Sequence, residues 1–233
     1  MNIVITGAGG GIGLALTRQY LVEGHGVLAT WRDAARAEPL LALAARHVGQ
    51  LHPLRLDVTG NDAPARLAEA AARHVPVLDL LIHAAGLFPA REGIGRTTAA
   101  SLAEAYATNA IAPLVLSQAL LPRLFASRRP RVVNLTSDLA GADGPDCPGA
   151  YAYAASKAAL NRITSLLAQE LAPAGIVVVA IDPGWTRSRM GGNQAPHAPD
   201  ETAERLMALI DGLAQEDSGR ILSCWNRTPS PRH

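Results

Sequence analysis

The stretch NIVITGAGGGIG, residues 2–13, decides the fold class of this 233-residue chain. A short apolar run ends in a turn that contains Gly7, Gly11 and Gly13, and a helical pattern follows directly. Glycines at these points let the backbone turn tightly and approach a pyrophosphate, while the start of the helix offers unpaired N–H groups. A merely structural turn is the alternative. The position between the first strand and the first helix nevertheless predicts a dinucleotide-binding turn.

Short apolar runs and longer helical patterns alternate along the rest of the chain. Strands are predicted over 2–6, 26–30, 51–56, 78–84, 131–136, 175–182 and 219–223, and helices near 11–24, 34–47, 61–74, 99–127, 150–172 and 200–214. Such alternation is typical of right-handed βαβ crossovers. We therefore expect an α/β fold, a doubly wound parallel sheet of about seven strands with helices on both faces (a Rossmann fold), built by one domain over residues 1–233.

Composition and charge narrow the class of partner. Apolar residues make up 48% of the chain and charged residues 18%, which is typical of a globular protein. The formal net charge of +1 gives no electrostatic reason to expect a nucleic-acid or membrane partner. No cleavable leader precedes the first strand, no apolar run reaches about 18 residues, and the seven histidines show no metal-ligand spacing. We expect a soluble cytoplasmic protein without a metal site, its Cys147 and Cys224 being reduced thiols.

Two further strand ends are expected to complete the cofactor site. Trp31 stands where an NAD-selective site usually carries an acid for the ribose 2′-hydroxyl, and Arg32 follows it. Arg32 can pair with a 2′-phosphate, which favours NADP and leaves NAD as the alternative; a solvated surface arginine is the other interpretation. After the third strand, Asp57 can accept from the adenine amino group while Val58 packs on the ring. Asp57 is equally suited to capping the next helix.

The stretch AYAYAASKAAL, residues 150–160, places two tyrosines before a lysine. If it is helical, Tyr153 and Lys157 are i and i+4 on one face, whereas Tyr151 falls about 120° out of alignment with the lysine. A phenol has a pKa of about 10, which a neighbouring ammonium or a cationic oxidised nicotinamide would lower. Tyr153 is therefore the candidate proton donor for carbonyl reduction, or acceptor for alcohol oxidation.

Two polar residues join this candidate site. Ser137, directly after the fifth strand, can hydrogen-bond the substrate oxygen and hold it beside the phenol. Asn109, inside the long fourth crossover helix, is polar among apolar neighbours. It can hold a water that links Lys157 to solvent, or it can be a satisfied core amide.

These motifs together resemble the short-chain dehydrogenase/reductase family. The segments TGAGGGIG, LDV, YAASK and DPGWTRS, together with Asn109 and Ser137, follow the family's order along almost the whole chain, and two of them are similar to C-factor and sniffer-like carbonyl reductases. The resemblance implies an NAD(P)-dependent oxidoreductase that passes hydride between the nicotinamide and a carbonyl or secondary alcohol. It also implies a homodimer or homotetramer.

The resemblance assigns roles to particular residues. It implies a catalytic tetrad of Asn109, Ser137, Tyr153 and Lys157, of which Tyr153 and Lys157 also bind the cofactor. It implies further cofactor contacts at Ile12, Ala85, Gly86, Pro183, Gly184, Thr186 and Ser188. The alternative from another functional class is a dinucleotide-binding regulator that turns nothing over.

The chain departs from the family pattern at several points. HAAG, residues 83–86, stands where the family usually has Asn-Asn-Ala-Gly, and that shape and a second glycine spacing are reminiscent of the family's extended branch. Only 76 residues follow Lys157, which favours the short branch. The loop before Tyr153 is a few residues longer than usual and brings Cys147 near the site, where a bystander thiol is the simpler interpretation. The irregular segment 187–200 either covers the ligand or is an ordinary surface loop.

Overall fold

The computed structural model describes residues 1–225, which form the predicted alternation of strands and helices around one parallel sheet. The strand order is β3-β2-β1-β4-β5-β6-β7, and every neighbouring pair runs parallel. The strands are β1 (Asn2–Thr6), β2 (Gly26–Trp31), β3 (Leu51–Arg55), β4 (Leu80–His83), β5 (Arg131–Leu135), β6 (Val177–Asp182) and β7 (Ile221–Ser223). The predicted doubly wound sheet of about seven strands is thereby confirmed.

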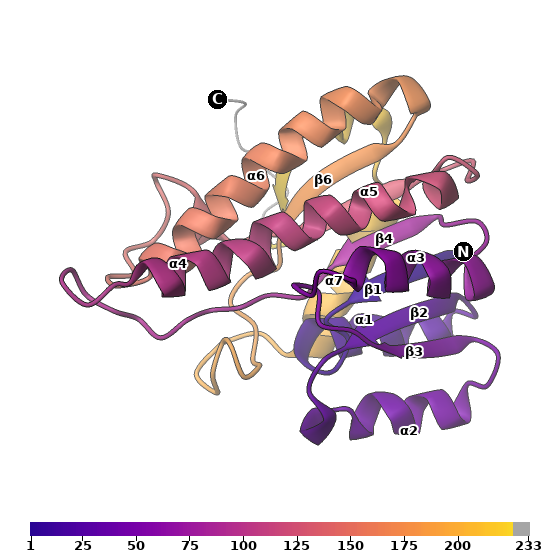
Figure 1. The fold of residues 1–233 in the computed structure, drawn as a ribbon, viewed down its shortest axis with the longest axis horizontal. Coiled ribbons are helices and arrows are strands. Elements are labelled where there is room, and N and C mark those ends of the chain that lie inside the picture. The colour runs from indigo at the N-terminus through magenta and orange to yellow at the C-terminus, as the bar shows by residue number, and fades with distance from the viewer. Residues whose placement is uncertain (226–233) are drawn as a thin grey trace.

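Helices cover both faces of the sheet (Figure 1). One layer contains α1, α2 and α7, and the other contains α3, α5 and α6, with α4 beside α6. Their bounds are α1 (Gly11–Val22), α2 (Glu38–Arg46), α3 (Ala63–His74), α4 (Ala99–Tyr106), α5 (Ala112–Leu124), α6 (Tyr151–Leu171) and α7 (Pro199–Asp211). Short 3₁₀ turns follow β2, β5, α6 and α7 at Ala34–Arg36, Asp138–Ala140, Ala172–Ala174 and Gln215–Asp217.

The alternation of side chains along each strand divides the core into two halves. In β1, Ile3 and Ile5 pack into the layer of α1 and α7, while Val4 between them packs into the layer of α3 and α5. All three side chains are fully buried, and burial of one such side chain stabilises the fold by roughly 1.5–3 kcal/mol. Because these strands are buried on both faces, their sequences are continuously apolar.

The predicted helix over 99–127 is interrupted. Residues Ala107–Ile111 form a π-helical segment between α4 and α5, and Asn109 lies in its middle. A π-helical turn carries one extra residue, so it shifts the side chains that follow and often accompanies a functional position. Helix α2 also starts later than predicted, because Pro39 has no N–H to donate and is suited to a first helical turn.

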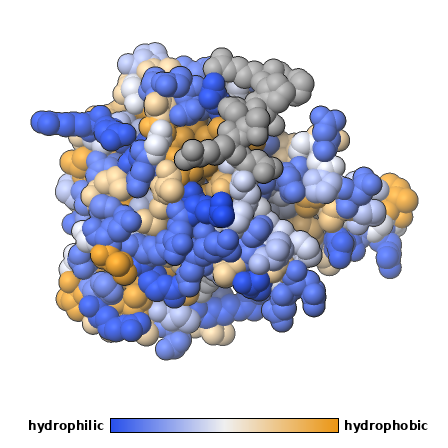
Figure 2. All heavy atoms as spheres, turned by 180° about the vertical axis from the view of Figure 1, so that it is seen from behind, coloured by the Kyte–Doolittle hydropathy of each residue, from blue (hydrophilic) through white to orange (hydrophobic). Residues whose placement is uncertain are grey.

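The surface seen from behind Figure 1 is mostly hydrophilic, and its apolar side chains lie in separate groups (Figure 2). Within residues 1–225, no helix has both the length and the apolar character that crossing a membrane requires. The strand order reverses between β1 and β4, the point at which open α/β sheets open a crevice at the carboxyl ends of their strands.

Candidate active site

A cavity of about 320 Å³ opens where the strand order reverses, at the carboxyl ends of the central strands. It is lined by the turn after β1, the loops after β2, β4 and β6, and the first turns of α6. Twelve of the site residues predicted from the sequence line it: Gly7, Gly11, Ile12, Gly13, Arg32, Val58, Ala85, Gly86, Tyr153, Lys157, Pro183 and Ser188.

Two glycines of the first turn are required by close packing. A Cβ on Gly7 would lie 2.6 Å from the backbone of Ala85, and a Cβ on Gly13 would lie 2.5 Å from the carbonyl oxygen of Gly7. Gly10 caps α1 without a side chain, and a Cβ there would meet no atom within 4 Å. Gly10, Gly11 and Ile12 line the cavity, so the start of α1, where the first N–H groups have no intrahelical partner, borders a space suited to the pyrophosphate of a dinucleotide.

Two arginines stand at the end of the cavity near β2. Arg32 Nη1 lies 3.9 Å from Asp57 Oδ2, and Arg36 Nε lies 3.2 Å from Asp33 Oδ2. Both arginines and Asp33 line the cavity. Arg36 was not among the site residues predicted from the sequence, although it follows Arg32 by four residues in TWRDAAR.

Asp57 does not cap the next helix. Its carboxylate accepts from the Thr59 N–H at 3.1 Å and from the Thr59 hydroxyl at 2.8 Å, whereas Asp62 occupies the N-cap position of α3 and makes no side-chain capping bond there. Burial opposes ionisation, but these two hydrogen bonds and the charge of Arg32 outweigh it and lower the pKa of Asp57. Asp57 thus holds the turn that presents Val58 to the cavity, and is not itself among the lining residues.

Tyr153 and Lys157 lie one turn apart on α6, and both are buried. The lysine Nζ is 5.8 Å from the centre of the tyrosine ring and donates to the carbonyl oxygen of Leu135 at 2.6 Å. Tyr151 is half exposed at the start of the same helix. The helical phase therefore pairs Lys157 with Tyr153, as the sequence predicted.

Burial shifts both groups away from ionisation. It raises the pKa of Tyr153 to about 12, although a hydrogen bond with Ser137 lowers it and the charges of Asp182 and Asp138 raise it further. Burial also lowers the pKa of Lys157 to about 8. Burial thus holds the phenol neutral, which suits a proton donor.

Ser137 stands beside the phenol at the carboxyl end of β5. Its hydroxyl donates to Asp138 Oδ1 at 3.1 Å and accepts from the Leu139 N–H at 3.2 Å. These contacts cap the 3₁₀ turn Asp138–Ala140 and fix the direction of the hydroxyl. Ser137 is close to Tyr153 despite the long loop between them, because β5 ends next to the start of α6.

Asn109 is fully buried, and three hydrogen bonds satisfy its amide. Nδ2 donates to Leu87 O at 2.8 Å and to Ser156 Oγ at 2.9 Å, while Oδ1 accepts from Leu87 N–H at 2.8 Å. No direct bond to Lys157 is present among the described contacts of Asn109. A Cβ added to Gly86 would lie 3.6 Å from Asn109 Oδ1 and 4.0 Å from Lys157 Nζ, so both groups flank Gly86.

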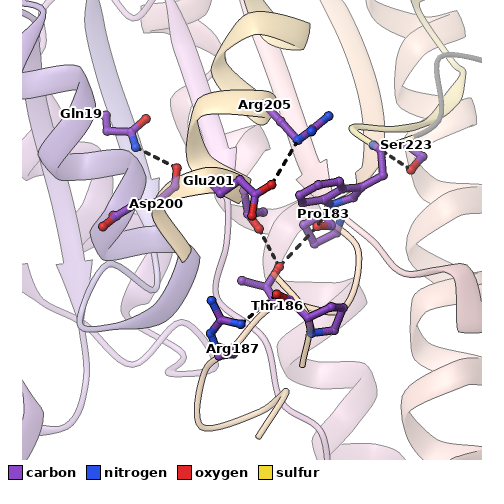
Figure 3. A network of polar contacts seen from close by, with 11 residues as sticks. Gln19, Pro183, Thr186, Arg187, Asp200, Glu201, Arg205 and Ser223 are labelled. Carbon is purple, nitrogen blue, oxygen red and sulfur yellow. Dashed lines mark hydrogen bonds and ion pairs between the residues drawn. The ribbon is translucent and has the colours of Figure 1, made fainter. Parts of the chain in front are cut away.

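The loop after β6 closes one side of the cavity. Thr186, labelled in Figure 3, is buried. Its hydroxyl shares a 2.9 Å hydrogen bond with that of Thr202 on α7. Gly184 and Thr186 therefore face α7 and the C-terminal strand, whereas Pro183, Ser188 and the residues after it line the cavity. Within the irregular segment 187–200, residues 188–190 line the cavity. Arg187 ties the start of this segment to its later part, because its guanidinium donates to the carbonyl oxygens of Ala195 and Pro196.

Other lining residues were missed by sequence reasoning. Most are neighbours of predicted residues. Arg189 and Met190 directly follow the DPGWTRS motif, and no sequence pattern marked them as site residues. Those not predicted as site residues are Gly9, Gly10, Thr30, Trp31, Asp33, Arg36, Leu56, Ala84, Leu87, Thr108, Leu135, Thr136, Arg189 and Met190.

Two residues flagged in the sequence lie next to the site. His83 is buried at the end of β4 and hydrogen-bonds Ser117 Oγ at 3.0 Å, which is the environment of a structural residue. Burial and the nearby Lys157 charge lower the pKa of His83 to about 3. Cys147 has a basic neighbour that the sequence did not reveal, since Arg91 Nη1 lies 4.0 Å from its sulfur.

Comparisons with known proteins agree with this geometry. Residues 1–199 match the family model for the short chain dehydrogenase. A short-chain dehydrogenase of Neurospora crassa, srdF, is 31% identical over 98% of this chain and 96% of its own length. The C-signal protein of Myxococcus xanthus is 36% identical over 62% of this chain and 87% of its own length.

Solved structures are similar over nearly the whole chain. The NADPH-bound carbonyl reductase from chicken fatty liver has a TM-score of 0.89 and 32% identity, with 97% of both chains covered. The carbonyl reductase Sniffer of Drosophila melanogaster has a TM-score of 0.91 and 29% identity, with 98% of both chains covered.

Proposed function

Because this chain belongs to the short-chain dehydrogenase family of oxidoreductases, we propose that it transfers hydride between NADP and a carbonyl compound or secondary alcohol, with Tyr153 as proton donor or acceptor. The observation that carries the proposal is the buried pair of Tyr153 and Lys157, which lines the same cavity as the Gly-rich turn. One domain over residues 1–233 would contain both sites; residues 226–233 lie outside the described structure.

The chemistry divides between the cofactor and the chain. A bound nicotinamide supplies the hydride or accepts it. The Tyr153 hydroxyl delivers a proton to the substrate oxygen, and Ser137 orients that oxygen by hydrogen bonding. The Lys157 ammonium stabilises the tyrosinate left behind, and its bond to Leu135 O holds the ammonium in position. Asn109 ties the loop after β4 to α6 and thereby keeps Lys157 and Gly86 in register.

The charges around the cavity support NADP over NAD. Arg32 and Arg36 line its β2 end, where a 2′-phosphate would lie, and guanidinium groups pair strongly with phosphate. Trp31 stands in place of the acid that would repel it. Two similar structures, the carbonyl reductase from chicken fatty liver and a protein from Burkholderia multivorans, have NADPH and NADP bound, respectively. NAD remains the alternative cofactor.

The surroundings of Tyr153 favour a carbonyl compound with apolar substituents. The ring centre of Phe88 lies 4.4 Å from that of Tyr153, and Leu87 and Met190 line the cavity. Such a wall excludes water from the reacting atoms. The similar solved proteins named carbonyl reductases support the same substrate class.

We also propose a cytoplasmic homodimer or homotetramer. Ile111, Phe125 and Leu166 expose about half of their surface along α5 and α6, where a second subunit would cover them. Light scattering after gel filtration tests the assembly state, and a monomer at micromolar concentration would contradict it.

The test of the proposed activity is a cofactor-loss assay with NADPH and with NADH against aldehydes, ketones and diketones. We expect turnover with NADPH and weaker turnover with NADH. A chain that binds NADPH tightly but turns over no member of the panel would instead indicate a dinucleotide-binding regulator.

A further inference from the structure

The turn Pro183–Thr186 packs against the indole of Trp225, a residue distant in sequence. The Trp225 Nε1–H donates to the carbonyl oxygen of Pro183 at 2.7 Å. Gly184 has a φ of +70°, and a Cβ there would lie 2.5 Å from the indole Cδ1 and Nε1. The backbone of the turn therefore packs on the indole with no room for a side chain.

The indole is itself fixed by two charged or titratable side chains. The ring of His197 stacks on it, with ring centres 3.4 Å apart and planes 17° from parallel. The guanidinium of Arg205 lies 4.1 Å from the indole centre and 3.9 Å from Glu201 Oε1 on the same helix α7. Both the aromatic stacking and the position of a guanidinium over the indole ring add attraction beyond simple packing.

These contacts join the two ends of the loop after β6. The loop begins at Pro183 and ends before α7. The Arg187 N–H donates to His197 O at 2.8 Å, which connects the start of this loop to its end. Figure 3 shows Pro183, Thr186, Glu201 and Arg205 converging between this loop and α7. Trp225 thus stands between the start of the loop, its end and α7.

The turn that Trp225 holds lies beside the reacting end of the cavity. Pro183 lines the cavity together with Tyr153 and Lys157. Asp182, directly before the turn, is close enough to raise the pKa of Tyr153, after burial has raised it. By contrast, Arg32 and Arg36 line the other end, after β2.

We infer that Trp225 is a positioning residue that sets the Pro183–Thr186 backbone for the nicotinamide half of the cofactor. This inference rests on the proposed function. It extends the site beyond residues 1–199, which match the family model, to the end of the described chain. It assigns Trp225 no part in binding the adenosine half.

The test compares two ligands on the purified full-length protein, NADPH and 2′,5′-ADP, which lacks the nicotinamide half. Trp225→Phe keeps an aromatic ring for His197 and Arg205 but removes the donor to Pro183. We expect NADPH affinity to fall roughly fivefold to tenfold, the usual effect of losing one hydrogen bond, while 2′,5′-ADP affinity stays unchanged. Calorimetric titration measures both affinities.

A matched control is Ile221→Ala, which removes a partly exposed side chain from the same C-terminal strand without touching the turn. It is expected to leave both affinities unchanged. Equal NADPH affinity in Trp225→Phe and the wild type would overturn the inference, and so would an equal loss for both ligands. A wild-type protein that binds neither ligand would overturn the proposed function and the inference with it.

Discussion

At the scale of single residues, the same burial acts on Tyr153 and Lys157 in opposite directions. It raises the pKa of the phenol to about 12 and lowers that of the ammonium to about 8. The neutral phenol and the less basic amine both follow from desolvation, which disfavours any charge. A cationic nicotinamide beside the phenol would offset part of that penalty. The sequence could predict the pairing from helical phase, but not the depth of burial that dominates the pKa.

The two arginines near β2 make the first prediction. Arg32→Ala and Arg36→Ala should each weaken NADPH binding by roughly tenfold, because each removes a charge-assisted contact to the 2′-phosphate, and should leave NADH binding unchanged. Fluorescence titration of both cofactors measures the ratio. Arg66→Ala, which removes an exposed arginine paired with Asp62, is the control. Equal losses for NADPH and NADH would contradict the assignment.

At the scale of elements, the turn between β1 and α1 combines two kinds of glycine. Gly7 and Gly13 are required because the backbones of Ala85 and Gly7 leave no space for a Cβ. Gly10 has free space beside it and an extended backbone that any residue can adopt. The glycine spacing predicts the turn. Only the structure shows that Gly7 and Gly13 are required by close packing, whereas Gly10 leaves space in the cavity.

A pair of substitutions tests this difference. Gly13→Ala should destabilise the protein by about 2 kcal/mol or more, even though alanine normally favours a helix, because its Cβ would lie 2.5 Å from Gly7 O. Gly10→Ala should keep the stability of the wild type and weaken NADPH binding. Urea denaturation and cofactor titration measure the two effects. A Gly13→Ala protein as stable as the wild type would refute the packing argument.

The long crossover helix shows where sequence patterns are insufficient. Apolar periodicity predicts one helix over 99–127, because a single extra residue in a turn leaves the pattern almost intact. The structure instead has a π-helical segment at Ala107–Ile111, which directs Asn109 toward Leu87 and Ser156. The sequence shows Asn109 as a polar residue among apolar ones, but its three hydrogen bonds go to Leu87 and Ser156, which lie in other segments of the chain.

At the scale of the whole molecule, the doubly wound sheet of about seven strands could be predicted from the alternation of strands and helices, whereas its strand order comes from the structure. Sequence spacing could not show that residues 188–190 cover the cavity or that Trp225 packs behind the turn after β6. Both depend on contacts between segments that no periodicity links. His83 is a further example, since its burial at the end of the central strand β4 and its bond to Ser117 come from the folded structure and not from sequence spacing.

Protonation of His83 is expected to cost stability below pH 6.5. The folded pKa is about 3 and the unfolded value about 6.5, so the unfolded chain binds the additional proton between these values and stability falls as the pH falls. Between pH 7 and pH 5 the wild type should lose about 2 kcal/mol more than His83→Asn, which retains a partner for Ser117. Urea denaturation at both pH values measures the difference. Parallel losses in the two proteins would contradict a neutral buried His83.

The most direct measurement for the whole account is the kcat/KM of Tyr153→Phe with NADPH and a carbonyl compound that the wild type reduces. The substitution removes one hydroxyl and keeps the ring that packs against Phe88. We predict a loss of about 100-fold to 10,000-fold in kcat/KM, the usual contribution of a general acid. Tyr153→Phe activity equal to that of the wild type would contradict the assignment of Tyr153 as the proton donor.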